Sequence, residues 1–439
     1  MSEKHNLSRR DFLKLAGTSA AAAAAASLLP AQTSPAGAST TTPALSPRPF
    51  RAAEQVTVTL AIQAFAHDAL KPVLAEWEKK TGNTVTLDSG PATGQEMMTK
   101  YAPAFQSGTS SVDVLSLDDV SGPAFARAGW LEPLDNVIPA ETWSDFPETF
   151  LPPVDKDPFH SYEGKRYRVP HEFAVGYFWY RKDWFDRDKT KVPTTWQEFV
   201  DVAKQYTKGD VWGTTEGMKK PGLTFVYVAH LAAAAGGDVF AFDDGTGQAL
   251  QFIYDMIYTD KIMSENVLTE DYTQQNDLYM KDRVAMMRQW PYFWGVSRDN
   301  KEWYAEGKAD IALHPAGPAG VKTWWGGWGF SLPKFSAHLD VAKDLIAWVT
   351  NNQNAPVLAE GQSWFVMPRK SILAAMKGGL VPYMQMYTDA GILVPRPYHP
   401  KQSDAEVAVD DISQLFLTKQ LSLKDALAQG KERIAALAA

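Results

Sequence analysis

Two hydrophobic periods alternate along the chain from residue 54 onward. Residues 56–62 (VTVTLAI) alternate and are rich in β-branched side chains, which predicts a strand. Between residues 70 and 77, apolar side chains recur at i, i+3, i+4 and i+7, the spacing of one helical face, and Gly82 is a typical helix stop. The first stretch after residue 54 therefore predicts a strand followed by a helix.

The same two patterns continue to the end of the chain. Further strands are predicted over 83–87, 112–117, 283–287 and 311–314, and further helices over 95–106, 196–206, 250–257, 341–349, 404–418 and 423–437. Thr195 and Glu198 form a capping box at the start of the helix that runs to Tyr206. Strands that alternate with helices predict an α/β fold with a parallel sheet. No repeat of about 20–50 residues is present, which excludes solenoids and propellers.

The N-terminus carries the pattern of an export signal. Residues 8–14 read SRRDFLK and match the twin-arginine motif at every fixed position. A short alanine-rich apolar stretch follows at 15–29, and residues 36–38 (AGA) offer a cleavage site. We expect a twin-arginine signal peptide over 1–38 and a disordered leader over 39–53, with a retained anchor as the alternative. The export signal predicts that the mature chain is periplasmic or otherwise extracytoplasmic. It is also expected to be soluble, because no further run of about 18 apolar residues occurs.

Charge and cysteine content exclude several classes of protein. The chain has 51 Asp and Glu against 43 Lys and Arg, a net charge of −8, and no long basic run, so nucleic acid is not expected as a partner. It contains no Cys, which excludes disulfide scaffolds, thiolate metal sites, cysteine nucleophiles and a lipidated cysteine.

Catalytic and cofactor motifs are missing as well. HExxH, Walker A, GxGxxG and GxSxG are all absent, and the eight His are scattered singly, so no metal and no cofactor are predicted. An SxxK at 331–334 and a KTG at 80–82 stand in the reverse order to that of serine–lysine acyltransferases, and we attribute both to chance. A carboxylate pair for glycoside hydrolysis stays open, because a sequence does not give the distance between two acids.

Aromatic residues are the unusual feature of the composition. Many of the 15 Trp gather with Tyr and Phe at 290–294, 303–304 and 324–330, beside Gly pairs and a Pro. Trp and Tyr offer flat apolar faces with one polar group, which match the C–H face and hydroxyl rim of a sugar ring. The alternative is a Trp-rich core, and it is weaker for Trp290 and Trp328, which adjoin turn residues.

Several blocks of the sequence occur in a recognisable order. They are DVLSLD with FARAGWLEPLD at 113–135, YEGKRYRVP at 162–170, YRKDWF at 180–185, VPTTW at 192–196, MRQWPY at 287–292, GGWG at 326–329 and PRP at 395–397. Together they resemble the extracellular solute-binding proteins of carbohydrate ABC transporters, the group that includes the maltose- and trehalose-binding proteins. The resemblance covers nearly all of residues 54–439.

The resemblance implies a two-lobed periplasmic-binding-protein fold of type II. Each lobe would be a sheet flanked by helices, and each would be discontinuous in sequence. The N-terminal lobe is expected over 54–169 and 311–364 and the C-terminal lobe over 170–310 and 365–439. The chain would cross between the lobes near 169–172, 309–311 and 364–367, and the ligand would lie in the cleft between them.

The resemblance also carries over a set of ligand-binding residues. Asp118 is similar to a sugar-binding Asp at a strand end, with capping of the following helix as its alternative role. The other expected ligand-binding residues are Trp290, Tyr292, Trp325, Gly327, Trp328, Glu172, Gln63, Phe65 and Arg396. Two positions depart from the family, because Ala174 replaces an acidic residue and Ser121 replaces an aromatic one; we expect Glu172 to substitute for the former.

The resemblance implies a monomeric, non-catalytic protein that captures a carbohydrate and delivers it to an ABC transporter permease in the membrane. Two alternatives stay open, an exported carbohydrate-active enzyme and a binder of a non-sugar solute. A polyamine binder would need several acids around the aromatic cluster, and the sequence shows few there. The sequence names neither the sugar nor the permease.

Overall fold

The computed structural model describes residues 55–91, 93–300, 303, 307–361 and 363–438. The predicted signal peptide, leader and twin-arginine motif lie outside these residues. No helix in the described part of the chain has both the length and the apolar character that crossing a membrane requires.

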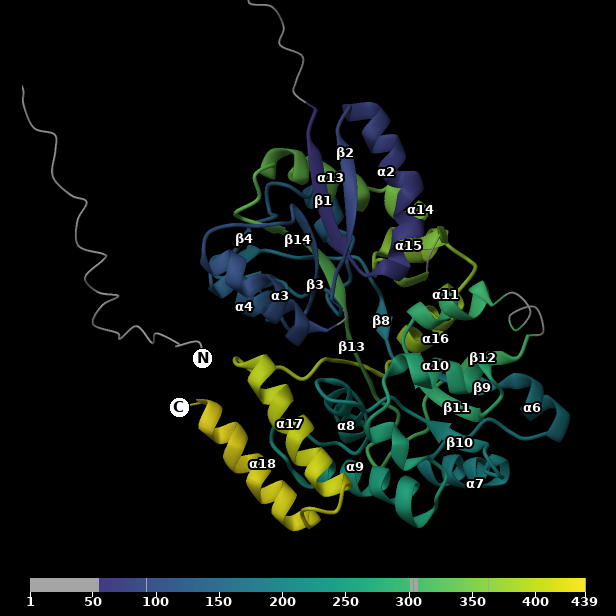
Figure 1. Ribbon diagram of the computed structural model, residues 1–439. Coiled ribbons are helices and arrows are strands. Elements are labelled where there is room, and N and C mark those ends of the chain that lie inside the picture. Colours follow the sequence, from purple (N-terminus) through teal and green to yellow (C-terminus); the bar gives the residue numbers. More distant parts are fainter. Residues whose placement is uncertain (1–54, 92, 301–302, 304–306, 362, 439) are drawn as a thin grey trace, which may run out of the picture. The chain divides into compact units, whose positions relative to one another are not determined.

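The first sheet combines strands from both halves of the chain (Figure 1). Its order is β2 (Thr84–Ser89), β1 (Thr57–Ile62), β3 (Val114–Asp118), β14 (Trp328–Pro333) and β4 (Leu131–Glu132), and β7 (Val169–Pro170) also pairs with β14. β1 is parallel to β2 and β3, but β14 is antiparallel to β3. The predicted parallel pairing is present in β2, β1 and β3, but the sheet as a whole is mixed because β14 enters antiparallel from a distant part of the chain.

The second sheet has the order β10 (Trp212–Thr215), β11 (Val284–Gln289), β9 (Tyr177–Arg181) and β12 (Ala309–Ala312). β10 is parallel to β11, whereas β9 is antiparallel to both of its neighbours. A third, small sheet contains β15 (Leu393–Pro395), β13 (Thr323–Gly326) and β8 (Ala174–Val175), and a short hairpin pairs β5 (Ser161–Tyr162) with β6 (Lys165–Arg166). Because β8 leads into β9 and β13 leads into β14, this small sheet lies where the chain passes between the two larger ones.

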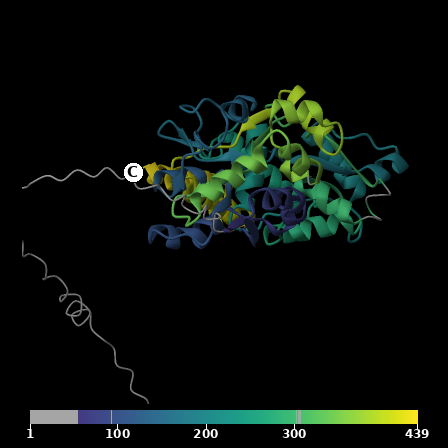
Figure 2. The same cartoon turned by 90° about the horizontal axis from the view of Figure 1, so that it is seen from above.

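Helices accompany each sheet (Figures 1 and 2). Those of the first half are α2 (His67–Thr81), α3 (Gly94–Gln106), α4 (Gly122–Arg127), α5 (Ala140–Ser144), α6 (Lys182–Asp188), α7 (Trp196–Tyr206) and α8 (Leu223–Ala234). Those of the second half are α9 (Asp244–Tyr254), α10 (Tyr272–Met280), α11 (Tyr292–Asp299), α13 (Leu339–Thr350), α14 (Asn354–Gly361), α15 (Lys370–Ala375), α16 (Val381–Asp389), α17 (Gln402–Leu417) and α18 (Leu423–Ala438). α13 and α14 contact α2, and α17 contacts α8, α9 and α18.

Local signals in the sequence explain several helix ends. α2 ends at Thr81 because Gly82 adopts the left-handed conformation with φ of 77°. The side chain of Thr195 caps α7 by accepting the Glu198 N–H, as predicted. The Glu198 carboxylate also accepts from the N–H and the hydroxyl of Thr194, each over 2.8 Å.

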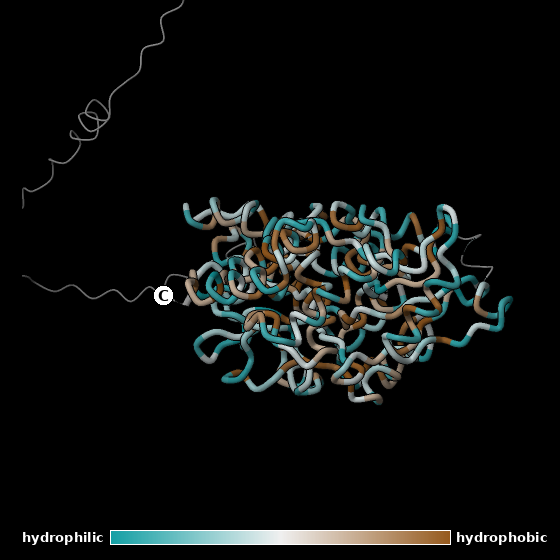
Figure 3. The backbone as a smooth tube through the Cα atoms, turned by 90° about the horizontal axis from the view of Figure 1, so that it is seen from below, coloured by the Kyte–Doolittle hydropathy of each residue, from teal (hydrophilic) through white to brown (hydrophobic). Residues whose placement is uncertain are grey.

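The apolar positions of these elements form a buried interior. The inward positions of α2, at residues 70, 73, 74 and 77, are all buried, as their spacing predicts. In Figure 3 the hydrophobic segments lie toward the inside of the described chain and hydrophilic ones gather along the outer loops. α8 is buried almost along its whole length, because its residues are apolar on every face.

Strand pairing shows where the chain changes sheet. β12 at 309–312 pairs with β9 of the second sheet, and the chain joins the first sheet only after Gly327. The crossing expected near 309–311 therefore falls inside the second sheet. The sequence of β12 alternates as in any half-buried strand, and this pattern does not indicate to which sheet the strand belongs.

Candidate ligand-binding site

Asp118 lies where the first sheet meets the small crossover sheet. It is the last residue of β3, and strand pairing places it opposite Trp328, the first residue of β14. The Gly327 N–H donates to Asp119 Oδ2 over 3.0 Å, and the Asp119 N–H donates to the Gly327 carbonyl oxygen over 3.1 Å. The N-cap of the following helix α4 is Ser121, so Asp118 does not have the alternative role of capping it.

Gly327 permits a close approach of two crossover segments. Its φ is 140°, and a Cβ at this position would lie 2.8 Å from the Cβ of Ala174 and 3.4 Å from Glu172 Oε2. Glu172 also accepts the Trp328 N–H over 3.2 Å. The absence of a side chain at Gly327 and the small Ala174 thus let Glu172 reach the start of β14.

Arg396 joins four parts of the chain in one ionic cluster. Its Nη1 lies 2.6 Å from Asp119 Oδ1 and 3.4 Å from Asp118 Oδ1, and its Nη2 lies 2.8 Å from Glu406 Oε1 on α17. The guanidinium also stands 5.0 Å from the ring centre of Trp324. Because its side chain is only 9% exposed, these contacts are shielded from water.

Burial sets the protonation of the carboxylates in this cluster. It raises the pKa of Asp118 well above the ordinary value, and the adjacent Asp119 charge raises it further. Burial acts in the same direction on Asp119, but the charges of Arg396 and Arg168 and the hydrogen bonds from Asp118 and Gly327 together outweigh it, so the pKa of Asp119 is lowered. Burial also raises the pKa of Glu172 well above its ordinary value, against the hydrogen bond from Trp328 N–H. Burial therefore favours the protonated forms of Asp118 and Glu172, which can donate a hydrogen bond, whereas Asp119 favours the ionised form, which accepts.

Trp290 is held among aromatic and cationic groups. Its ring meets that of Trp324 edge-on at 5.3 Å between centroids and an angle of 63°. The guanidinium of Arg288 stands 4.2 Å from its ring centre. Through Trp324, Trp290 connects with Arg396 and so with the carboxylate cluster.

Tyr292 and Phe65 form a second aromatic contact. Their ring centroids are 5.5 Å apart, and Phe65 also meets Trp364 at 5.0 Å. Asn276 Nδ2 donates to the hydroxyl oxygen of Tyr292 over 2.9 Å. Phe65 is 43% exposed, so much of its face stays open to solvent.

Two other predicted residues, Gln63 and Trp325, are buried and bound to other parts of the protein. Gln63 is buried, donates from Nε2 to the Pro91 carbonyl oxygen over 2.8 Å and accepts from Ser116 Oγ over 3.4 Å. Trp325 is 6% exposed and packs on Phe150 with 5.1 Å between ring centroids. Contacts join five residues of the predicted set into one cluster: Asp118, Glu172, Gly327, Trp328 and Arg396. Trp290 connects to this cluster through Trp324. Tyr292 and Phe65 form a separate contact beside Trp364.

Four residues of the cluster were not predicted. Asp119 and Glu406 bind Arg396, Trp324 packs against it, and Arg168 donates from Nε to the Leu117 carbonyl oxygen over 2.9 Å. Asp119 directly follows Asp118, a predicted ligand residue, and this position next to a predicted residue was the only sign in the sequence that Asp119 belongs to the site. Glu406 lies on an amphipathic helix, where an acid ordinarily faces water, and its sequence position carries no such signal.

The cluster leaves almost no free volume. The cavity lined by Arg168, Glu172, Trp325 and Trp328 measures about 10 Å³, close to the smallest space that holds one water molecule. A sugar ring could enter only after the ion pairs around Arg396 and the segments that carry them have moved apart.

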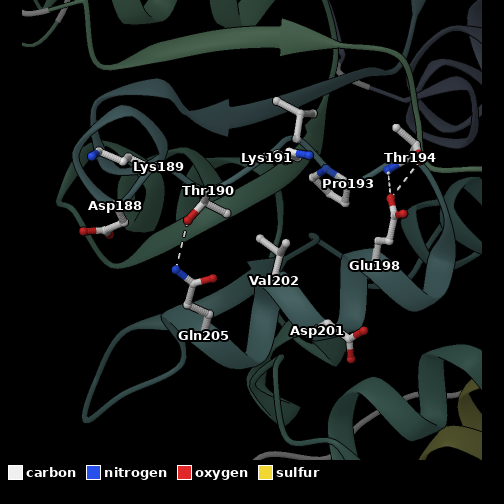
Figure 4. A pocket seen from close by; sticks show the side chains of 11 residues that line it. Asp188, Lys189, Thr190, Lys191, Pro193, Thr194, Glu198, Asp201, Val202 and Gln205 are labelled. Carbon is white, nitrogen blue, oxygen red and sulfur yellow. Dashed lines mark hydrogen bonds between the residues drawn. The ribbon is translucent and has the colours of Figure 1, made fainter.

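A much larger hollow lies elsewhere, between residues 188–194 and α7 (Figure 4). Its volume is about 580 Å³. Its polar side chains bond to one another, since Gln205 Nε2 donates to Thr190 Oγ1 and Glu198 accepts from Thr194. No Trp lines it, and none of the predicted ligand-binding residues takes part. Within the described residues, no group of three or more His, Asp or Glu could hold a metal ion.

Comparison with known proteins gives the following matches. A sequence model of the bacterial extracellular solute-binding proteins matches residues 66–356. A probable ABC transporter-binding protein of Deinococcus radiodurans is 26% identical in an alignment of 328 residues that covers 69% of this chain and 75% of the relative. An arabinooligosaccharide-binding protein of Halalkalibacterium halodurans is 24% identical over 271 residues, 57% of each chain.

Solved structures share the arrangement of the elements. The maltose-bound protein MalE3 of T. maritima superimposes with a TM-score of 0.78 at 24% identity, over 87% of this chain and 100% of that one. The chain therefore has the predicted two-lobed fold of type II periplasmic binding proteins, with each lobe assembled from separate segments.

Proposed function

Because the chain belongs to the family of bacterial extracellular solute-binding proteins, we propose that it captures a sugar between its two lobes and delivers it to the permease of an ABC transporter. One observation carries the choice of a sugar. Trp290 and Trp324 stand beside a buried cluster in which Asp118, Asp119 and Arg396 combine hydrogen-bond donors and acceptors. A flat apolar ring face next to paired polar groups suits the two chemistries of a pyranose.

The relatives support the same choice. The matched proteins include one described as binding arabino-oligosaccharides and one solved with maltose. The polar residues of the cluster differ in charge state, so hydroxyl groups of either hydrogen-bonding direction can be satisfied. An unmet hydrogen bond in a buried site is what excludes a wrong sugar.

We place the lobes by strand pairing. The first lobe takes the elements up to β7 together with β14, α13 and α14; the second takes β9 to β12 together with α16, α17 and α18. This division keeps the predicted first crossing near 169–172 and moves the second to Gly327. The predicted third crossing at 364–367 moves beyond Lys370, because Lys370 N–H donates to the Asp145 carbonyl oxygen in the first lobe.

The proposed cycle requires the lobes to separate and close. Arg396 links Asp119 at the end of β3 to Glu406 on α17, so its ion pairs join the two lobes. A sugar would displace these bonds and replace them with its own hydroxyl contacts to both sides. Only a ligand that binds the closed arrangement better than the open one shifts the equilibrium toward closure.

Export by the twin-arginine pathway is part of the proposal. The family is extracellular, and residues 8–14 match the twin-arginine motif. Replacing Arg9 and Arg10 by Lys should strand the precursor in the cytoplasm, as seen by fractionation of cells. Export at the normal level would contradict the twin-arginine route and leave the binding proposal untouched.

Thermal unfolding of the purified protein with a sugar panel tests the function. The panel contains maltose, maltotriose, trehalose, an arabino-oligosaccharide and D-mannitol, with spermidine as a non-sugar cation. A ligand at about 1,000 times its dissociation constant stabilises the folded state by about 4 kcal/mol, which raises the midpoint by several degrees. Stabilisation by spermidine alone would favour a cation binder. Conversion of a sugar to product, measured by chromatography of the same mixtures, would favour the enzyme alternative.

A further inference from the structure

Arg288 is a buried cation directly behind the proposed stacking ring. It lies near the end of β11, and its side chain is 4% exposed. Trp290 follows two positions later, so strand alternation puts both side chains on the same side of the chain. The guanidinium lies 4.2 Å from the ring centre of Trp290 and 6.0 Å from that of Trp324. This geometry is that of a cation–π contact shielded from water.

Three neighbours fix the position of Arg288, through its guanidinium, the space around its side chain and its backbone. Glu216 Oε1 lies 3.4 Å from Arg288 Nη1. At Gly176, a Cβ would stand 2.3 Å from Arg288 Nε, so only glycine leaves room for the side chain. The side chain of Gln275 donates to the Arg288 carbonyl oxygen and ties down the backbone. Nε itself has no hydrogen-bond acceptor among the described residues.

We propose that Arg288 is a positioning residue that fixes the ring of Trp290 for stacking against a sugar. The inference rests on the function proposed above and adds a residue that touches no ligand. The guanidinium covers one face of the indole and Trp324 abuts its edge. Because Trp290 is only half-buried, part of its ring remains exposed for the ligand. A ring that is already immobilised loses less conformational freedom when a ligand binds, and affinity rises accordingly.

The same chain offers a matched control. Arg181, at the end of β9 in the same sheet, is 1% exposed and stands 4.3 Å from the ring centre of Trp184. Its guanidinium pairs with Asp183 and Asp282. Arg181 and Trp184 thus form a similarly buried Arg–Trp pair, in which the Arg has carboxylate partners. Within the described residues, no contact is recorded between this pair and the proposed site.

The first experiment needs no ligand. The protein is produced with 5-fluorotryptophan, and the fluorine resonance of Trp290 is identified as the one lost in Trp290→Phe. We expect Arg288→Met to shift or broaden this resonance and Arg181→Met to leave it in place. If Arg288→Met does not fold, Arg288→Lys, which keeps the charge but not the planar group, takes its place with the same expectation. An unmoved Trp290 resonance would overturn the proposal, whether or not any sugar binds.

The second experiment measures affinity by calorimetry with the member of the sugar panel that binds most tightly. Arg288→Met should weaken binding about 3- to 30-fold, the range of a shielded cation–π contact. Arg181→Met should leave the affinity unchanged. In a Trp290→Ala background, Arg288→Met should have no further effect, because a residue that acts through the ring has nothing left to position.

The outcomes separate the two proposals. An equal loss of affinity from Arg288→Met with and without the Trp290 ring would show a purely structural role and overturn the inference. If no sugar in the panel binds, the proposed function fails, and the fluorine spectra still decide whether Arg288 positions the ring.

Discussion

At the scale of single residues, burial decides which groups of the site carry charge. Asp118 and Glu172 have raised pKa values because burial disfavours their ionised forms, whereas Arg396 keeps the adjacent Asp119 ionised. The site thus combines the buried ion pairs of Arg396 with carboxyl groups whose neutral form burial favours. Such a mixture can donate to some hydroxyl groups of a ligand and accept from others.

Two predicted aromatic residues, Trp328 in this cluster and Trp290, which reaches it through Trp324, should carry binding energy. Trp290→Ala and Trp328→Ala should each weaken binding of the tightest sugar by about 1–3 kcal/mol, the range of one buried aromatic contact. Calorimetric titration measures the loss, and Trp184→Ala, which removes the Trp of the control pair, should bind normally. If both variants unfold at lower temperature and bind unchanged once folded, the Trp residues belong to the core instead.

Glu216 should make stability depend on pH. Burial raises its pKa to about 8 from an ordinary 4.5, although Arg288 acts to lower it. The folded state therefore binds the proton more tightly than the unfolded state does. Its stabilising contribution is complete below about pH 4.5 and is lost as the pH rises through about 8.

Glu216→Gln removes this titration and preserves the size of the side chain. We expect the free energy of unfolding of the wild type, relative to the variant, to fall between pH 5 and pH 9. The fall should be on the order of 1 kcal/mol per pH unit within that window. Urea unfolding at three pH values measures it, and a difference that stays constant with pH would refute the assignment.

At the scale of elements, the sequence predicts what local chemistry controls. Gly82 ends α2, Thr195 caps α7, and the apolar spacing of α2 matches its buried face. Each of these signals acts within a few residues, so it can be recognised without knowledge of the fold. The predicted helices over 341–349, 404–418 and 423–437 correspond to α13, α17 and α18, because their apolar spacing is also a signal that acts within a few residues.

Pairing between distant segments could not be predicted in this way. β14 inserts between β3 and β4, about two hundred residues away in sequence, and alternation alone does not name a partner strand. The cluster around Arg396 depends on this insertion, because Gly327 meets Asp119 only when β14 lies beside β3. The resemblance to a family, rather than the periodicity, led to most of the residues found there.

The crossover at Gly327 should tolerate no side chain. Gly327→Ala introduces a Cβ 2.8 Å from that of Ala174 and forces a φ of 140° on a residue with a side chain. We expect a loss of about 1–3 kcal/mol in the free energy of unfolding. Adding Ala174→Gly should restore only the part due to the clash. Full stability of Gly327→Ala alone, measured by urea unfolding, would contradict this account of the crossover.

At the scale of the whole described chain, side chains link the two sheets and their helices. Arg396 joins Asp119 to Glu406, Phe65 meets Tyr292, and the ring of Phe159 lies 5.5 Å from that of Tyr398. The contacts of Arg396 and Phe65 involve residues that are proposed to bind the ligand. A bound sugar would take over the role of the ion pairs in holding the two sides together.

The ligand-free protein in solution should exchange between closed arrangements and open ones in which the Arg396 ion pairs are broken, so closure by a ligand should be visible. The radius of gyration from small-angle scattering should decrease when the tightest sugar of the panel is added at saturation. The reason is that a ligand with contacts on both lobes raises the population of the closed arrangement. The matched control is Trp290→Ala at the same sugar concentration, which should show a smaller change. An unchanged radius at saturation would exclude the hinge mechanism and leave the binding assignment intact.

The central claim is that one sugar lies between the two lobes, held by the aromatic residues and the carboxylate cluster. A crystal structure of the protein with its tightest sugar tests this most directly. We predict a ring stacked on the free face of Trp290, hydroxyl groups hydrogen-bonded to Asp118, and Arg396 released from at least one of its carboxylate partners. A sugar bound in the hollow beside α7, or one that contacts a single lobe and leaves the Arg396 ion pairs intact, would contradict the account.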